Sequence, residues 1–198
     1  MSSSFEGFFI DDILNCPEDM NAAGLKTRLY YAPSNFFKKI ELPSVLGDTN
    51  FKNILEIQEN GIEFQEDLEW SYIDVLIDEN ELKSMLSGSQ QKKKTKIELE
   101  IFVLGLESHI LGFLEMHKNT PFVFGVPDAN GNSWIVGNLR NRAFIDSADA
   151  STQKKYEDNA GVAIKINCKS TLYLFKGSVE YMAKRGDFNK DFNNDFFI

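Results

Sequence analysis

Histidine is a frequent metal ligand and proton carrier, and this chain has only two, His109 and His117. They are eight residues apart, so in a helix they would lie on roughly the same side but about two turns from each other. A zinc ion takes about four ligands, and the neighbouring sequence offers no further histidine or cysteine. We favour one exposed and one partly buried histidine, and expect no metal site.

Two acidic patterns are candidates for chemistry. Glu98 and Glu100 alternate along a strand-like stretch, so both carboxylates would lie on one face and could do acid–base work. The competing interpretation, which we prefer, is a solvated strand face. Residues 187–191 resemble the start of a calcium loop, but Phe192 and Ile198 occupy the positions where such a loop has Gly and Glu.

The remaining catalytic patterns are absent from the sequence. Cys16 and Cys168 are far apart and in no CxxC pattern, which favours reduced thiols over a disulfide framework. No Ser-His-Asp or Cys-His set stands out, and neither GxGxxG nor GxxxxGK occurs. We therefore expect a protein that is not an enzyme and has no cofactor.

Composition bounds the class of protein. The 198 residues, 42% hydrophobic and 13% aromatic, suffice for one folded domain with a buried core. A net charge of -9 disfavours general DNA or RNA binding, although DNA could still pass through a channel of such subunits. The N-terminus has no signal-peptide pattern, and no apolar run reaches the ~20 residues of a membrane span.

The spacing of apolar residues predicts mostly strands. Helical spacing occurs once, at about 105–118, and Asn130-Gly131 predicts a hairpin turn. The segment 78–86 is open between a helical turn and the end of a strand, and 36–45 and 147–159 are expected as a connector and a loop. The stretches expected as strands are 25–32, 53–58, 62–77 (one or two strands), 97–104, 122–126, 133–136, 143–145, 161–168 and 172–175.

This order of elements predicts an α+β, mainly β fold: an antiparallel β-sandwich or barrel with one flanking helix. We expect an N-terminal arm at 1–23, a single β domain at 24–180 and a C-terminal tail at 181–198. In the strand 161–168, Val162, Ile164, Ile166 and Cys168 share one face and should point inward.

Two features have no catalytic explanation and suit contacts between subunits. The basic segment 87–96 is either a solvated loop or an arm that reaches an acidic neighbour. Three phenylalanine doublets in polar surroundings are either local core anchors or interface residues. The candidate inter-subunit residues are Lys92, Lys93, Lys94, Lys96, Phe8, Phe9, Phe36, Phe37, Phe196 and Phe197.

Residues 122–175 resemble the C-terminal half of tail tube (major tail) proteins of phages and prophages of Bacteroidetes hosts. The resemblance lies in an apolar strand, a D-x-N-G hairpin, Trp134 and Gly137, a polar loop and an alternating strand from Gly161. The segment 24–32 is similar to the opening strand of that family. The loop at 151–155 lacks the glycine-bearing segment usual in the family.

The resemblance implies a structural protein of the virion tail, made in the host cytoplasm. Such subunits have a β-sandwich with a flanking helix and form rings, typically of six, whose inner strands join into a continuous barrel. The rings stack through loops and arms into a conduit for DNA ejection, which implies partners such as further copies, the tape measure and the terminator. DNA would be present only in transit, past a negative lumen wall, with no membrane involved.

Alternative functions remain open from the sequence. A ring-forming head–tail adaptor or tail terminator would share the assembly features without stacking. A ligand-binding β-barrel, or an enzyme with a dispersed site, would need polar groups that converge in an apolar pocket.

Overall fold

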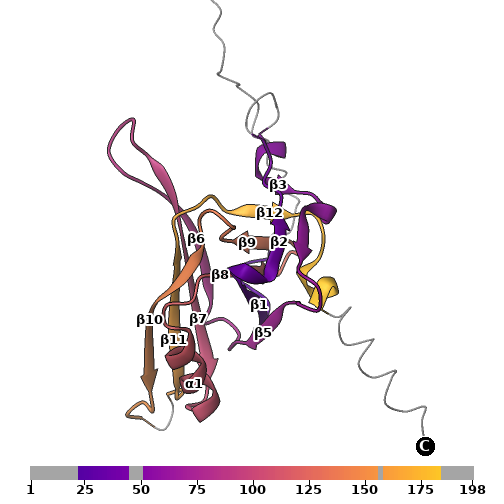
Figure 1. The fold of residues 1–198 in the computed structure, drawn as a ribbon. Coiled ribbons are helices and arrows are strands. Elements are labelled where there is room, and N and C mark those ends of the chain that lie inside the picture. The colour runs from indigo at the N-terminus through magenta and orange to yellow at the C-terminus, as the bar shows by residue number, and fades with distance from the viewer. Residues whose placement is uncertain (1–21, 45–50, 156–157, 184–198) are drawn as a thin grey trace, which may run out of the picture.

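The computed structural model describes residues 22–44, 51–155 and 158–183 (Figure 1). One α-helix, α1 (Ser108–His117), stands among many strands, and residues 179–183 begin a further helical segment. Short 3₁₀ turns occupy Ser34–Phe36, Asn53–Leu55 and Glu59–Gly61. The strands are β1 (Arg28–Pro33), β2 (Phe37–Ile40), β3 (Glu56–Ile57), β4 (Ile62–Phe64), β5 (Ser71–Asp74), β6 (Glu81–Ser87), β7 (Lys94–Leu104), β8 (Phe122–Pro127), β9 (Ser133–Val136), β10 (Ala143–Ser151), β11 (Gly161–Cys168) and β12 (Tyr173–Phe175).

Ten strands form one large sheet, and β2 and β4 form a small one. The main path of the large sheet runs β3-β12-β9-β8-β10-β11-β7-β6, and β1 pairs with both β8 and β5. All pairs are antiparallel except the parallel pair β12–β3. The two ends of the path do not pair, so the sheet is open. The expectation of an α+β, mainly β sandwich is confirmed, and the barrel alternative is wrong.

The large sheet folds over at β8, so that the layer of β10, β11, β7 and β6 packs against the layer of β1, β8 and β9 (Figure 1). Every residue of β8 is buried. On one side, Phe122, Phe124 and Val126 join a core with side chains of β7 and β11. On the other side, Val123 packs in a second core beneath the small sheet. Coverage of both faces explains why β8 has no polar alternation.

The layer of β10, β11, β7 and β6 is antiparallel throughout. Residues 97, 99 and 101 of β7 are buried, and so are their register neighbours on β11, including Ile164 at 1% exposure. The inward orientation predicted for Ile164 is confirmed. The pairing of β10 with β11 shifts between Ile145 and Ser147, which makes Asp146 the extra residue of a β-bulge.

Helix α1 covers one end of this sandwich and begins close to the end of β7. Gly105 has a φ of 89°, a left-handed conformation that suits glycine, and it turns the chain out of β7. Phe113 packs edge-on against Tyr31, with ring centroids 5.2 Å apart. None of the helix residues is fully buried. The helix expected at 105–118 is confirmed with tighter bounds.

Several polar segments are more regular than their sequences indicate. The segment 78–86 contains most of strand β6, the supposed connector at 36–45 contains β2, and strand β10 extends through Ser151 into the supposed loop. The predicted strand at 53–58 holds only the two residues of β3 after a 3₁₀ turn. Edge strands with one poorly covered face need no apolar alternation, because their backbone partner fixes them.

Candidate functional site

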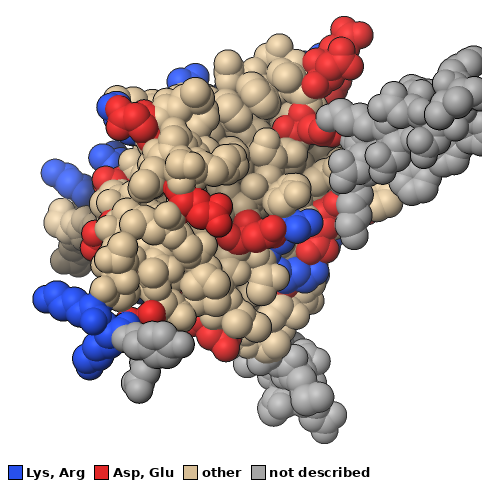
Figure 2. Space-filling view, turned by 90° about the horizontal axis from the view of Figure 1, so that it is seen from below, with Lys and Arg blue, Asp and Glu red and all other residues tan. Residues whose placement is uncertain are grey.

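Charged side chains are unevenly spread over the surface. Figure 2 views the molecule from the α1 end and shows acidic side chains running across the middle of that end. The opposite end of the same sheet holds the β6–β7 hairpin, with its run of lysines. The α1 end also holds the β10–β11 turn with the exposed Lys154 and Lys155, so it carries side chains of both charges, whereas the hairpin tip is basic.

The two histidines do not form a site with each other. His117 packs against Phe113 and Phe122, and its Nδ1 lies 3.2 Å from the Thr120 hydroxyl. His109 is exposed on the other end of α1. Within residues 22–44, 51–155 and 158–183, no group of three or more His, Cys, Asp or Glu side chains could hold a metal ion.

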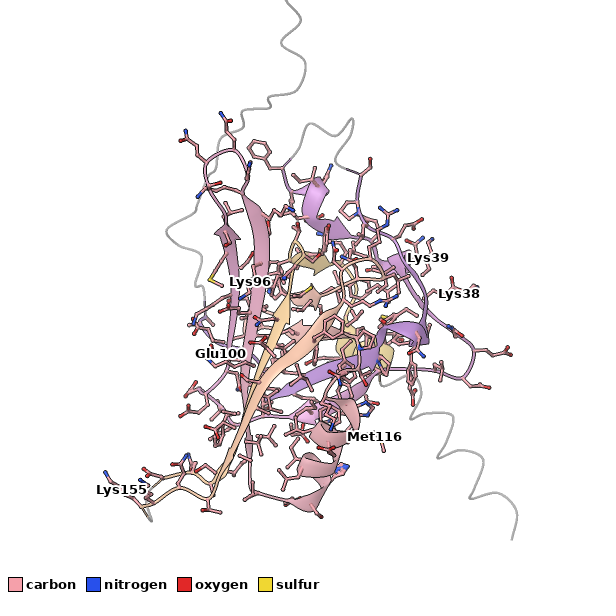
Figure 3. All side chains as sticks on the ribbon, turned by 60° about the vertical axis from the view of Figure 1, so that its left-hand side comes forward. Lys38, Lys39, Lys96, Glu100, Met116 and Lys155 are labelled. Carbon is pink, nitrogen blue, oxygen red and sulfur yellow. The ribbon has the colours of Figure 1, made fainter. Side chains whose placement is uncertain are left out.

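Glu98 and Glu100 lie on the same face of β7, as predicted, but each is paired with a lysine. Figure 3 labels Lys96 and Glu100 on this strand. Lys96 Nζ lies 2.5 Å from a Glu98 carboxylate oxygen, and Lys165 Nζ lies 2.9 Å from one of Glu100. The hydrogen bond from Lys165 lowers the pKa of Glu100 from its ordinary value. Both carboxylates are thus paired with lysines on a solvated face, which is the alternative preferred above.

Cys168 is a buried free thiol. Its Sγ lies 3.4 Å from the carbonyl oxygen of Asn141, and burial raises its pKa to about 12. The thiolate is the reactive form of cysteine, so this side chain is inert at neutral pH. Cys16 and the segment 187–198 with its calcium-like pattern lie outside the described residues.

The lysine-rich segment is a hairpin tip rather than a loop over its whole length. Strand β6 continues to Ser87 and β7 starts at Lys94, so only residues 88–93 connect them. Lys92 and Lys93 are exposed on this tip. Lys96 lies within β7 and is paired with Glu98, so its assignment to a loop is corrected. The tip requires Gly88, whose φ is 116° and where a Cβ would lie 2.5 Å from the Lys92 carbonyl oxygen.

The one described phenylalanine doublet belongs to the second core. Phe37 is 4% exposed and packs against Phe64 and Trp70, with ring centroids 4.5 and 5.1 Å away. Phe36 is partly buried against the same cluster. This position fits local core anchoring, the other of the two alternatives for the doublets. The doublets Phe8-Phe9 and Phe196-Phe197 lie outside the described residues.

Sequence reasoning missed the open edges of the layer β10-β11-β7-β6. In the described part of the chain, β6 pairs only with β7, and β10 pairs with β11 and, at a single position, Ala143, with β8. One backbone edge of β6 and most of one edge of β10 therefore have no strand partner. Ala148 and Ala150 align with the buried residues Ile164 and Val162, yet both alanines are exposed. The run of small and acidic residues at 146–150, next to the apolar segment 143–145, was the signal available in the sequence.

The solvent face of this layer carries balanced charge. Its lysines at 83, 96 and 165 each contact a carboxylate, those of Glu81, Glu98 and Glu100 respectively. Phe102 and Phe144 are on the same face by their register. This face therefore combines paired charges with two partly exposed aromatic rings.

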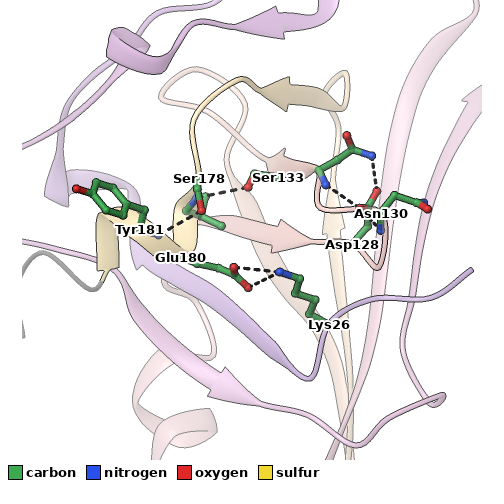
Figure 4. A network of polar contacts seen from close by, with 9 residues as sticks. Lys26, Asp128, Asn130, Ser133, Ser178, Glu180 and Tyr181 are labelled. Atoms are coloured by element: carbon green, nitrogen blue, oxygen red, sulfur yellow. Dashed lines mark hydrogen bonds and ion pairs between the residues drawn. The ribbon is translucent and has the colours of Figure 1, made fainter. Parts of the chain in front are cut away.

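The opposite side of the molecule holds a polar network that fixes the β8–β9 turn (Figure 4). Asp128 accepts hydrogen bonds of 2.8–2.9 Å from the backbone of Asn130 and Asn132, from the Asn132 amide and from Trp134 Nε1. Burial acts to raise the pKa of Asp128, but these hydrogen bonds outweigh it and lower the pKa. Nearby, Lys26 contacts both carboxylate oxygens of Glu180. This network is structural, because its donors and acceptors satisfy one another.

A groove of about 490 Å³ lies between α1, the end of β7 and strand β5. Ile73, Val103, Ile110 and Phe113 contribute an apolar lining, and Asp74 and Glu107 contribute carboxylates. His109, Tyr31 and Tyr72 line the groove as well, so an imidazole and two phenol rings lie beside its apolar floor. Of the two carboxylates, Asp74 is paired with Arg28.

No family model, curated protein or solved structure matches this chain in the three comparisons. No helix in the described part of the chain is both long and apolar enough to cross a membrane.

Proposed function

We propose that this chain is a structural subunit that assembles with its own copies into rings, and that stacked rings form a phage tail tube. The resemblance at 122–175 supports the tail-tube identity, and the open layer β10-β11-β7-β6 supports the assembly. The open layer is the observation that carries the proposal.

The strand directions in this layer suit closure of a ring. Because β10, β11, β7 and β6 alternate in direction, β10 and β6 run opposite to each other. When a second copy is placed by rotation about a common axis, its β6 reaches the first copy's β10 in an antiparallel orientation. Pairing of this kind is heterologous and closes when the rotation closes. It would also remove both edges from solvent, which proteins otherwise protect against aggregation.

The charge-compensated face would line the lumen of such a ring. Each lysine that it presents at 83, 96 and 165 is already in contact with a carboxylate. Binding to DNA depends mainly on cations that neutralise phosphates, so paired lysines retain a passing duplex weakly. A conduit needs that weak retention.

Two neighbouring proline substitutions on β10 test the edge. Successive residues of a strand direct their N–H groups to opposite sides, so of Ala148 and Asp149 one faces β11 and the other the open edge. Proline removes the N–H. We expect one of the variants Ala148→Pro and Asp149→Pro to lower the melting temperature, and the other to keep it but abolish rings in negative-stain images.

The unmodified chain at high concentration is the reference for this test. Rings and stacks support the tail tube, and closed rings that never stack support an adaptor or terminator instead. A strict monomer at every concentration, or normal rings from both proline variants, would overturn the assembly proposal.

A further inference from the structure

Strand β7 has a different kind of surface at each end. It begins at Lys94 next to the hairpin tip and ends at Leu104 beside the groove under α1. Eleven residues of strand span roughly 33 Å. The tip and the groove of one molecule are therefore too far apart to touch each other.

The groove combines an apolar floor with the carboxylate of Glu107, while its other lining carboxylate, Asp74, is paired with Arg28. Glu107 is exposed at its mouth, beside α1, and Leu104 is 56% exposed. The turn after β5 crosses the same end of β7, because the Leu76 N–H donates to the Phe102 carbonyl oxygen at 2.8 Å. The Asn80 side chain on the same turn accepts a hydrogen bond from the Phe102 N–H, so the turn brings Asp78 and Glu79 to this end.

The hairpin tip has the complementary chemistry. Lys92, Lys93 and Lys94 follow one another in the sequence, and no ion pair to any of them occurs among the described residues. Leu86 lies beside them in register with Thr95 and is 69% exposed, which makes it the most exposed leucine of the described chain. An exposed apolar side chain at the base of a lysine-bearing tip matches an apolar groove with the carboxylate of Glu107 at its mouth.

We infer that the hairpin tip of one copy docks into the α1 groove of a second copy, with Leu86 on the apolar floor and the lysines opposite Glu107, Asp78 and Glu79. This contact rests on the proposed function and specifies how one ring would meet the next. The contact is heterologous, because the tip of one copy meets the groove of the next. It points along β7, whereas the edge pairing runs across the strands. A series of such contacts would therefore add copies along the β7 direction without closing into a ring. Edges would build the ring, and the tip and groove would stack it.

Charge exchange at one pair of positions tests the contact. We expect Glu107→Lys and Lys93→Glu, each alone, to raise the concentration needed for stacking by at least about tenfold, and the double variant to recover much of the loss. The ring diameter in negative-stain images should not change. Stacking of the unmodified chain should also weaken with added NaCl, since the contact is made at the surface.

Two controls separate local damage from lost docking. Glu107→Gln removes the charge without placing a cation at the start of α1, where the helix dipole disfavours it. Glu41→Lys makes the same reversal on the small-sheet side of the molecule, where Glu41 is paired with Lys39, and should leave stacking unchanged. Melting temperatures of all variants should stay close to that of the parent.

The outcomes distinguish this inference from the proposed function. Absence of rings in the unmodified chain would overturn the ring itself. Normal rings whose stacking is unaffected by both Glu107→Lys and Lys93→Glu would overturn the docking contact and leave the ring intact. Failure of the double variant to stack, with both single variants defective, would show that these two side chains do not face each other.

Discussion

The β8–β9 and β6–β7 hairpins are both antiparallel, yet they have opposite relations to the rest of the molecule. Strand β8 is buried on both faces, and its turn is closed by four hydrogen bonds to Asp128. The β6–β7 hairpin extends past the core, with Leu86 and the lysine tip in solvent. A hairpin that organises the core is locked by polar contacts within the chain. A hairpin whose polar and apolar groups lack such contacts is suited to meet another molecule.

The largest effect on stability is expected in the core between the two hairpins, where Ile164 of β11 packs with residues of β7 and β8. Ile164→Asp places a carboxylate where the side chain is 1% exposed, without a partner. We expect a loss of several kcal/mol in the free energy of unfolding, enough to unfold the domain. Circular dichroism and thermal melting measure this.

Lys165→Asp is the matched control for that change. Lys165 is the next residue of β11 and faces solvent. It should leave the fold intact, because the lost contact with Glu100 and the new repulsion between the two carboxylates both lie on a solvated face. If Ile164→Asp melts normally, the inward register of β11 is wrong.

An intermediate effect is expected at the locked turn. In Asp128→Asn the side-chain amide would face the donors of Asn132 and Trp134, and about 2 kcal/mol of stability should be lost. Because the pKa of Asp128 is lowered in the folded state, its contribution is present above the ordinary value of 3.8 and is lost as pH falls through the folded pKa. The difference between parent and variant should therefore shrink at acidic pH.

Denaturant titration at pH 7 and at pH 3 measures that difference, with Asp149→Asn on the exposed edge strand β10 as control. A variant as stable as the parent at pH 7 would show that the hydrogen bonds to Asp128 do not hold the turn.

The smallest effect on global stability should come from the open hairpin. Gly88→Ala forces a Cβ to within 2.5 Å of the Lys92 carbonyl oxygen, so the tip must rearrange. Few other contacts depend on the tip, and we expect a loss of about 1 kcal/mol or less. Trypsin should cleave after Lys92 and Lys93 faster than in the parent.

Gly112→Ala provides the contrast, because nothing lies within 4 Å of the added Cβ in α1 and alanine favours a helix by about 1 kcal/mol. This variant should melt slightly higher. Unchanged cleavage in Gly88→Ala would mean that the tip is not held in the conformation described.

Periodic, apolar parts of the fold could be predicted from the sequence. Strand β11 alternates because one face is buried and the other solvated, and the D-x-N-G turn follows from local backbone preferences. Strands β6 and β10 were underestimated, because their pairing partners fix them while their side chains are exposed. The strand propensity of a segment does not reveal a pairing strand that lies far away in the sequence.

The candidate site was predictable in charge but not in geometry. The lysine run was visible, whereas the division of its members between tip and strand depends on the register of Ser87 with Lys94. The groove could not be foreseen, since it joins β5, β7 and α1. Phe37 is an example in which the sequence hid burial. It belongs to a doublet in a polar stretch, yet it packs in an aromatic core with Phe64 and Trp70.

The bulge at Asp146 also affects how readily unassembled chains aggregate. It divides the ladder of β10 into two short stretches that are out of step with each other. A stray strand of regular geometry could follow only one of them, and the short contact would be weak. Strand β6 of a neighbouring copy, whose pairing with β7 is regular over its whole length, would likewise follow only one of the two stretches. The bulge thus limits how far any strand, including that of the proposed neighbour, can extend the sheet along β10.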